Sequence, residues 1–190
     1  MLAIPAFEIG IWNAWIFMLI NFLPMPIIMR VHKGLVEDSL KSYGGVHKAV
    51  YYITWVLWVL AFVYSIFLPL RLGTIWFYVG LPIALVGVVA FVMVIVSFVT
   101  TPIGEKPITT GLYRYSRHPM YISQLVMFIG VGIASASWLF LLLSIVYTGL
   151  GFIYAGSEER MCLEKYGDAY REYMERTPRW IGLPLSLIHI

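Results

Sequence analysis

Long runs without a charged residue dominate the chain. They cover residues 9–29, 49–70, 72–104 and 119–157. A membrane-spanning helix needs about 20 predominantly apolar residues, so each of the first three runs predicts one span. The fourth run is too long for one pass and is interrupted by Ser-Ala-Ser at 135–137, which predicts a tight helical hairpin. The five predicted spans are residues 9–29, 49–70, 75–99, 120–134 and 138–156.

Composition supports an all-α, polytopic membrane protein. Hydrophobic residues make up 61% of the 190 residues and charged residues 12%, whereas soluble domains average roughly 25% charged residues. We expect a single membrane domain over residues 1–184, with residues 185–190 left as an uncertain tail. The alternative has four spans, with the last run re-entrant. A net charge of +3 is too small to indicate nucleic acid, and a single cysteine, Cys162, excludes an intrachain disulfide.

The basic residues divide unequally between the two sides of this arrangement. Arg71 falls on one side, and every other lysine and arginine falls on the opposite side. Because basic loops stay in the cytosol, we expect the N-terminus outside and loops 30–48 and 100–117 inside, together with the tail from residue 157 to 184. Six tryptophans are expected at the membrane interfaces: Trp12, Trp15, Trp55, Trp58, Trp76 and Trp138. The glycines at 130, 132, 149 and 151 are expected to be close-packing points rather than a nucleotide-binding loop, since neither pair completes GxGxxG.

The charged tail predicts a cytosolic amphipathic helix that leaves the membrane and stops at Thr177-Pro178. Glu158 and Glu159 begin this tail directly after the last apolar run. Carboxylates at a helix C-terminus oppose the helix dipole. Two of them there therefore indicate a function rather than a contribution to stability.

Arg117, His118 and Pro119 stand at the start of the predicted helix 120–134. Proline suits a first helical turn, and the free N–H groups of that turn attract anions. Because the hairpin is antiparallel and tightly joined, its geometry places Arg117, His118 and Tyr121 beside Glu158 and Glu159. These groups either form a structural salt bridge or hold a zwitterionic ligand. The preceding loop, residues 104–111, is suited to fold over such a ligand.

At these positions the chain resembles the membrane methyltransferases grouped with isoprenylcysteine carboxyl methyltransferase and phospholipid N-methyltransferase. Residues 107–121 read PITTGLYRYSRHPMY, with the glycine, the tyrosine and Arg-His-Pro-x-Tyr of the family pattern. Glu158-Glu159, YGDAY at 166–170, Pro178-Arg179 and Pro184 follow in the family's order. Two positions depart from the prenylcysteine enzymes: Glu105 replaces a histidine, and Tyr154 replaces an arginine suited to an acceptor carboxylate.

The resemblance implies S-adenosylmethionine (SAM) as the methyl donor and a lipid or lipophilic small molecule as the acceptor. A phospholipid amine is the preferred acceptor, and a prenylcysteine carboxylate is the alternative. Arg117 and Glu158 are the predicted catalytic residues. The predicted cofactor contacts are Pro107, Ile108, Tyr113, His118, Pro119, Met120, Tyr121 and Glu159. No metal ligand is expected. Two other functions remain open: a sterol-type membrane reductase that uses NADPH, and a transporter or scaffold without enzymatic activity. The sequence leaves the oligomeric state undetermined.

Overall fold

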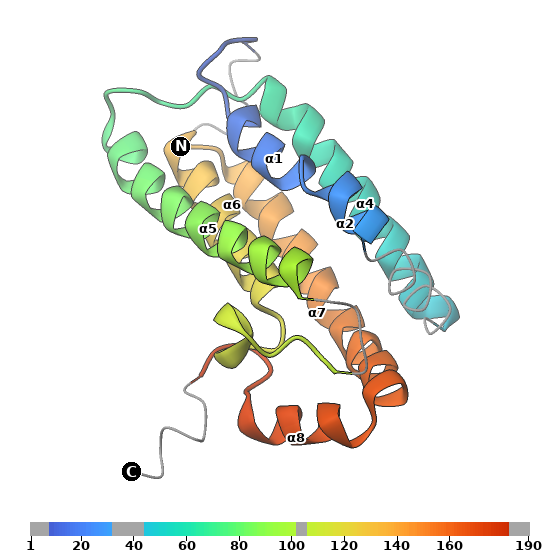
Figure 1. Ribbon diagram of the computed structural model, residues 1–190. Helices are drawn as coiled ribbons and strands as arrows, with labels where there is room; N and C mark the ends of the chain where they lie inside the picture. The colour runs from blue at the N-terminus through green and yellow to red at the C-terminus, as the bar shows by residue number, and fades with distance from the viewer. Residues whose placement is uncertain (1–7, 32–43, 102–105, 183–190) are drawn as a thin grey trace.

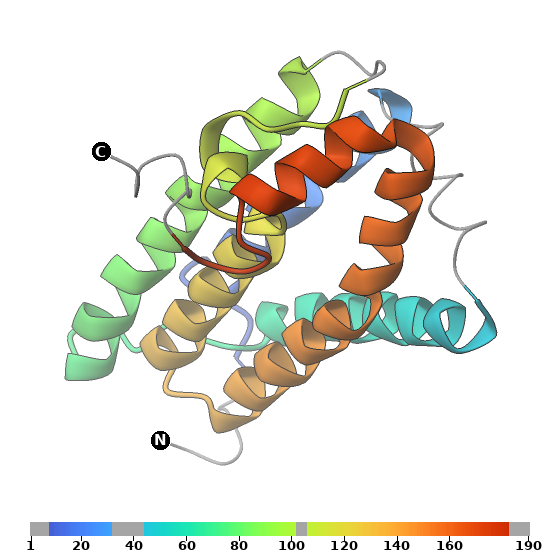
Figure 2. The ribbon, with the colours of Figure 1, turned by 90° about the horizontal axis from the view of Figure 1, so that it is seen from below.

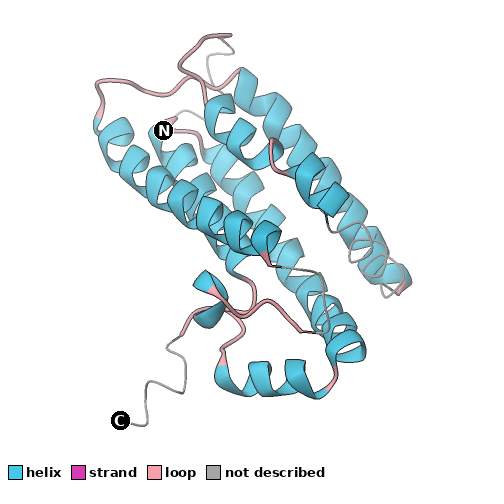
Figure 3. Cartoon of the chain, in the orientation of Figure 1, coloured by secondary structure: helices cyan, strands magenta, loops and turns pink. Residues whose placement is uncertain are grey.

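A computed structural model describes residues 8–31, 44–101 and 106–182. Within these ranges every regular element is helical, and the only strand-like pairing is an isolated bridge between Asn13 and Pro69. Figure 3 shows this all-helical construction. The all-α prediction is confirmed. Some predictions concern residues outside the described ranges, namely Lys33, Lys41, Glu105, Pro184 and the tail 185–190.

The helices form an elongated bundle (Figure 1). In chain order they are α1 (Trp15–Phe22), α2 (Met25–Val31), α4 (Gly45–Ile66), α5 (Ile75–Thr100), the short 3-10 helix η1 (Gly111–Arg114), α6 (Pro119–Ala134), α7 (Trp138–Tyr166) and α8 (Asp168–Arg176). Three of them, α4, α5 and α7, are long and apolar enough to cross a membrane. The segment 15–28 and α6 are shorter apolar helices. Five spans and their orientation in a membrane therefore remain predictions.

The first apolar run is two helices rather than one. Helix α1 ends at Phe22 and α2 begins at Met25, with Leu23 and Pro24 between them. Proline lacks the N–H that a continuous helix needs, and it disfavours helical backbone at the residue before it. Pro24 therefore explains why the predicted helix 9–29 is divided.

Helix α7 continues well past the predicted end of the last span. It runs to Tyr166, so Glu158 and Glu159 lie within the helix and not at its C-terminus. The predicted position of the glutamate pair at a helix C-terminus was therefore wrong, and the helix dipole does not bear on its role. The tail is also not one helix: Gly167 has φ +54 and separates α7 from α8. Figure 2 shows α8 folding back from the end of α7 toward η1.

The predicted hairpin between α6 and α7 is confirmed. Three residues, 135–137, join the two helices, and the hydroxyl of Ser137 accepts a hydrogen bond from the backbone N–H of Phe140 to cap α7. Ala136 takes a left-handed conformation at φ +53, which closes the turn within this short length. The beginning of α6 consequently lies beside the second half of α7.

Helix α6 packs on α5 with almost no side chain between the two backbones. A Cβ atom added to Gly80 or Gly87 of α5 would overlap the backbone of α6, and one added to Gly130 would overlap α5 at Ala84. Small residues permit this approach in apolar helix pairs. The packing roles predicted for Gly130 and Gly132 are confirmed, because a Cβ atom added to Gly132 would overlap the side chain of Leu141 on α7. Gly149 has open space around it, so the close-packing prediction is wrong for that residue.

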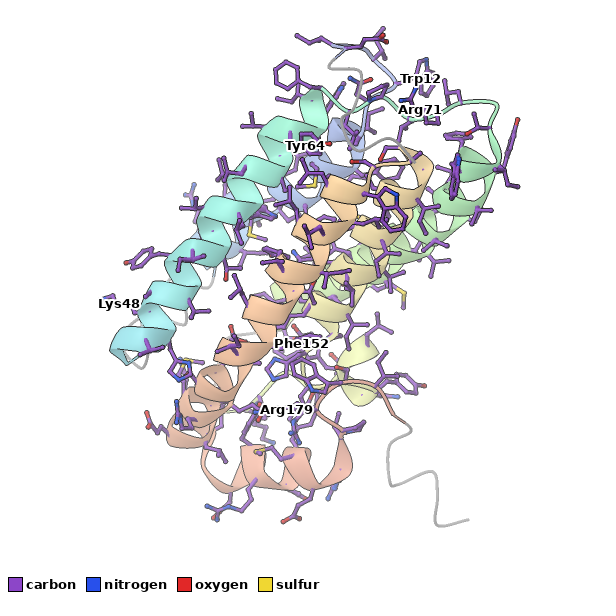
Figure 4. The ribbon with its side chains drawn as sticks, turned by 180° about the vertical axis from the view of Figure 1, so that it is seen from behind. Trp12, Lys48, Tyr64, Arg71, Phe152 and Arg179 are labelled. Carbon is purple, nitrogen blue, oxygen red and sulfur yellow. The ribbon has the colours of Figure 1, made fainter. Side chains whose placement is uncertain are left out.

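The two ends of the bundle differ in charge. In Figure 4, Lys48 and Arg179 lie toward one end and Arg71 and Trp12 toward the other. The end with Arg179 also carries α8, whose sequence is the most charged of the described helices. This separation agrees with the predicted division of the basic residues.

Candidate active site

A cavity of about 320 Å³ opens at the charged end of the bundle. Its walls come from α2, α4, the ends of α5 and α7, the loop before η1, the first turns of α6, and α8. Cavities that bind small molecules have volumes of roughly 300–1,000 Å³ and are mostly apolar with a few placed polar groups. This cavity has that character. Arg117, His118 and Glu158 contribute charged and titratable groups to its lining, and Met25, Ile28 and Trp55 contribute apolar ones.

A cluster of four charged or titratable side chains ties α6 to α7 and to the tail. Nε of Arg117 donates to Oε1 of Glu159 at 2.9 Å, and Nη2 of Arg179 donates to Oε2 at 2.7 Å. Nε2 of His118 lies 3.2 Å from Oε1 of Glu159. Glu159 is buried. These three partners compensate its negative charge, which explains how a buried carboxylate is tolerated in a largely apolar helix.

Arg117 also holds the end of α8. Its Nη1 donates to the carbonyl oxygens of Met174 at 3.0 Å and Thr177 at 3.1 Å, and its backbone N–H donates to the carbonyl of Pro178. Carbonyl groups in the last turn of a helix lack helical partners. The guanidinium supplies those partners, so the residue that neutralises Glu159 also fixes the tail against α6.

Glu158 faces the cavity beside Tyr121 and His118. The hydroxyl of Tyr121 donates to Oε1 of Glu158 at 2.8 Å, and Nδ1 of His118 is 3.6 Å from Oε2. The side chain of Glu158 is 28% exposed, against 7% for Glu159. The two neighbouring carboxylates thus have different environments: Glu159 is enclosed by cations, and Glu158 lies on the cavity wall.

His118 lies between the two glutamates at the N-terminal end of α6. Burial lowers the pKa of its imidazole, but the hydrogen bonds to Glu158 and Glu159 raise it by more, so the pKa is above the ordinary value. Protonation gives the ring a donor on each nitrogen. The histidine therefore favours the charged form that serves both carboxylates at once.

Tyrosines from η1 and α8 close the cavity on its outer side. The hydroxyl of Tyr173 donates to the carbonyl of Tyr113 at 2.7 Å, which joins α8 to η1. Burial raises the pKa of Tyr113, Tyr170 and Tyr173 above the ordinary range for phenols. These side chains consequently stay neutral and present aromatic faces to the cavity.

The structure brings nearly all of the predicted site residues to this one cavity. Those that line it are Pro107, Ile108, Tyr113, Arg117, His118, Pro119, Met120, Tyr121 and Glu158. Glu159 is not part of the lining and reaches it only through Arg117 and His118. A direct contact of Glu159 with a ligand stays a prediction.

Sequence reasoning missed the inner wall of the cavity. Trp55 and Trp58 were expected at a membrane interface, but both line the cavity, and Trp58 is only 4% exposed. Gln124 and Tyr147 also line it and are joined by a hydrogen bond. Gln124, an amide inside a charge-free run, was the available signal, because polar residues within apolar helices often mark functional positions.

Comparison with known protein families identifies the same part of the chain. Residues 98–169 match the sequence model of a family described as phospholipid methyltransferase. The matched stretch includes the end of α5, the loop and η1, the α6–α7 hairpin and the two glutamates. It contains the lining residues Arg117, His118 and Glu158 and all of the predicted site residues. Through this segment the chain is similar to the phospholipid methyltransferases, a family of membrane methyltransferases.

Proposed function

We propose that the chain transfers a methyl group from SAM to a lipophilic acceptor, with the amine of a phospholipid as the preferred acceptor. The observation that carries this proposal is the cavity itself, whose lining combines Glu158 and His118 with apolar side chains such as Trp55 and Met25. A water-soluble donor and a lipid acceptor need such a pair of environments in contact. We place the charged end at the cytosolic face, following the distribution of the basic residues.

The residues at the charged end fit SAM. Its carboxylate is matched by the free N–H groups of the first turn of α6, beside the positive charge of His118. The neutral aromatic rings of Tyr113 and Tyr170 suit an adenine ring and a sulfonium cation. Pro107 and Ile108, from the loop over the cavity, add apolar contact.

When bound, SAM supplies a methyl group on a positively charged sulfur, which is already activated for attack by a nucleophile. The chain's contribution is chiefly to orient the acceptor and exclude water, and proximity and orientation can supply much of the barrier reduction. Glu158 is positioned to orient an amine acceptor and to take up its proton. Tyr121 holds Glu158 through the 2.8 Å hydrogen bond.

Arg117 and Glu159 act mainly by positioning in this proposal. Nε and Nη1 of Arg117 are engaged with Glu159 and with carbonyl groups at the end of α8. The pair keeps α8 against the cavity and keeps His118 in place. A direct contact of Arg117 with the reacting groups, expected from the sequence, remains a prediction.

The charge of Glu158 favours an amine acceptor over a carboxylate. A prenylcysteine presents a carboxylate, which a neighbouring carboxylate repels in a cavity of low dielectric constant. Tyr154 also stands where the prenylcysteine enzymes have an arginine. The amine of a phospholipid brings the opposite charge and matches Glu158.

Incubation of purified protein with methyl-labelled SAM and mixed lipids, followed by extraction and chromatography, tests the proposal. We expect the label in an amine lipid, with Glu158→Gln reducing incorporation at least about 100-fold. Label in a prenylcysteine ester would replace the preferred acceptor with the alternative. Saturable binding of NADPH without binding of SAM would favour a reductase. Absence of saturable SAM binding by the folded protein would exclude the proposed activity.

A further inference from the structure

The residues after α8 return along the segment that precedes α6. The backbone N–H of Arg117 donates to the carbonyl of Pro178 at 3.0 Å, and that of Gly182 donates to the carbonyl of Tyr115 at 3.2 Å. These two hydrogen bonds hold the tail segment 178–182 at both of its ends. Trp180, in the middle of this segment, is thereby kept beside the start of α6.

The indole of Trp180 lies against two other rings. Its centroid is 5.3 Å from that of His118, at an interplanar angle of 39°, and 4.0 Å from that of Phe152 on α7. Tyr121 brings another aromatic ring to His118, with centroids 5.8 Å apart. Trp180 is not part of the cavity lining. Its ring can therefore act on a bound ligand only through a neighbour such as His118.

Four charged side chains surround the same imidazole. Glu158 and Glu159 of α7 lie 3.6 and 3.2 Å from its two nitrogens. The guanidinium groups of Arg117 and Arg179 bind Glu159 and bring two positive charges to this place. Like charges oppose protonation of a neighbouring group. The carboxylates therefore favour the imidazolium and the guanidinium groups oppose it, and an additional group that favours the cation shifts this balance.

Tryptophan is the aromatic side chain that attracts a cation most strongly, and the attraction acts within about 6 Å of the ring centroid. His118 meets this condition at 5.3 Å. From this contact we propose that Trp180 is a positioning residue, which stabilises the protonated imidazole of His118 and holds it between Glu158 and Glu159. This inference rests on the proposed function, in which the positive charge of His118 lies beside the carboxylate of SAM.

Loss of the Trp180 ring has a consequence that depends on pH. A neutral imidazole has one donor nitrogen instead of two, so it cannot donate to both glutamates, and it offers no positive charge to an anionic group. Well below its titration range His118 is protonated with or without Trp180, and the ring makes no difference. Within that range and above it, the protonated fraction is lower without the ring. Weaker binding of SAM that appears only as pH rises therefore separates an effect on His118 from general support of the fold.

The titration of His118 is measured by NMR on the full chain in detergent micelles, with isotope-labelled histidine and with His118→Asn to assign the signal. We expect Trp180→Leu, which keeps an apolar side chain next to the imidazole, to lower the titration midpoint by about half a pH unit. Half a pH unit corresponds to a factor of about three in the ratio of protonated to neutral imidazole. The KM for SAM is therefore expected to rise about threefold above the wild-type midpoint and to match wild type well below it, with kcat nearly unchanged.

Trp138→Leu is the matched control, because Trp138 begins α7 at the far end of the hairpin from His118 and is 60% exposed. It is expected to change neither the midpoint nor the KM for SAM. Fluorination of the Trp180 indole is a second test that leaves the shape of the side chain nearly unchanged. Fluorine withdraws negative charge from the face of the ring, so the midpoint is expected to fall in the same direction. This measurement decides the question if Trp180→Leu does not fold.

A midpoint that both alterations leave unchanged or raise would overturn the inference. A KM for SAM that increases by the same factor at every pH would also overturn it, because the tail would then only support the fold. If the midpoint falls but the folded protein binds no SAM, the action of Trp180 on His118 stands and the proposed methyltransferase activity fails.

Discussion

Arg117 donates a 2.9 Å hydrogen bond to Glu159 across the α6–α7 hairpin, although the two residues are 42 positions apart. The same guanidinium donates to the carbonyl groups of Met174 and Thr177. One side chain thereby connects three parts of the chain: the segment directly before α6, the second half of α7 and the end of α8. We therefore expect the shape of the cavity to depend on this connection.

Replacing Arg117 with alanine is expected to lower the free energy of unfolding by about 3 kcal/mol, because it leaves Glu159 buried with one cation fewer. Unfolding in mixed detergent measures the change, and limited proteolysis is expected to cut the released α8 faster. Arg171→Ala is the control. Arg171 pairs with Asp168 on the exposed face of the same helix, and such pairs contribute little. Equal effects of the two substitutions would contradict the tethering role of Arg117.

Replacing Tyr121 with phenylalanine removes the hydroxyl that donates to Glu158 and leaves the ring in place. A hydrogen bond to a charged group contributes about 1.5–3 kcal/mol. We therefore expect kcat/KM for methylation to fall by roughly 10- to 100-fold while the protein remains folded at the assay temperature. Tyr78→Phe, on the exposed face of α5, is expected to keep full activity. Wild-type activity of Tyr121→Phe would show that Glu158 needs no positioning from this hydroxyl.

The meeting of Arg117, His118 and Tyr121 with the two glutamates was predictable because covalent geometry dictates it. A three-residue connection between antiparallel helices allows only one pairing of their ends, so the sequence positions of the residues were sufficient. This pairing of the helix ends can be predicted without knowledge of side-chain packing. This part of the site follows from length, apolar runs and a turn.

The end of α7 was not predictable in that way. The sequence places two charges after an apolar run, and charges usually mark where a span ends. Here Arg117, His118 and Arg179 surround Glu159, so the helix continues with a compensated charge inside it. Those partners lie outside α7, so the residues around Glu159 in the sequence do not indicate that its charge is compensated.

Trp58 shows a second limit of structure prediction from sequence. A tryptophan in an apolar helix has the same sequence pattern whether it faces the membrane interface or the protein interior. Its burial depends on the contact of α4 with α1 at Phe22. The cavity's inner wall therefore emerges only from tertiary packing.

The raised pKa of His118 predicts a dependence of stability on pH. Burial opposes the charged form, but Glu158 and Glu159 favour it by more, so the folded protein binds this proton more tightly than the unfolded chain, whose histidine pKa is about 6.5. The resulting stabilisation is complete below about pH 6.5 and is lost as pH rises through the folded pKa.

Comparison of wild type with His118→Asn between about pH 6 and 9 tests this dependence. Thermal unfolding in detergent is expected to show the largest advantage of the wild type at the acidic end of the range and a shrinking advantage above it. His47→Asn, at the start of α4 and outside the cavity lining, controls for the loss of a histidine as such. A difference between wild type and His118→Asn that grows toward pH 9 would contradict the predicted sign.

Gly130→Ala tests whether the α5–α6 contact holds the bundle together. The added Cβ would overlap the backbone of α5 at Ala84, and overpacking of this kind typically costs 1–3 kcal/mol, so we expect a loss of about 2 kcal/mol in the free energy of unfolding. Gly149→Ala is the matched control, because no atom lies within 4 Å of its added Cβ. Alanine suits a helix interior better than glycine, so this variant is expected to gain about 0.5 kcal/mol. If both variants unfold like the wild type, the close approach of α5 and α6 does not contribute to stability, and the position of α6 must depend on the charged cluster instead.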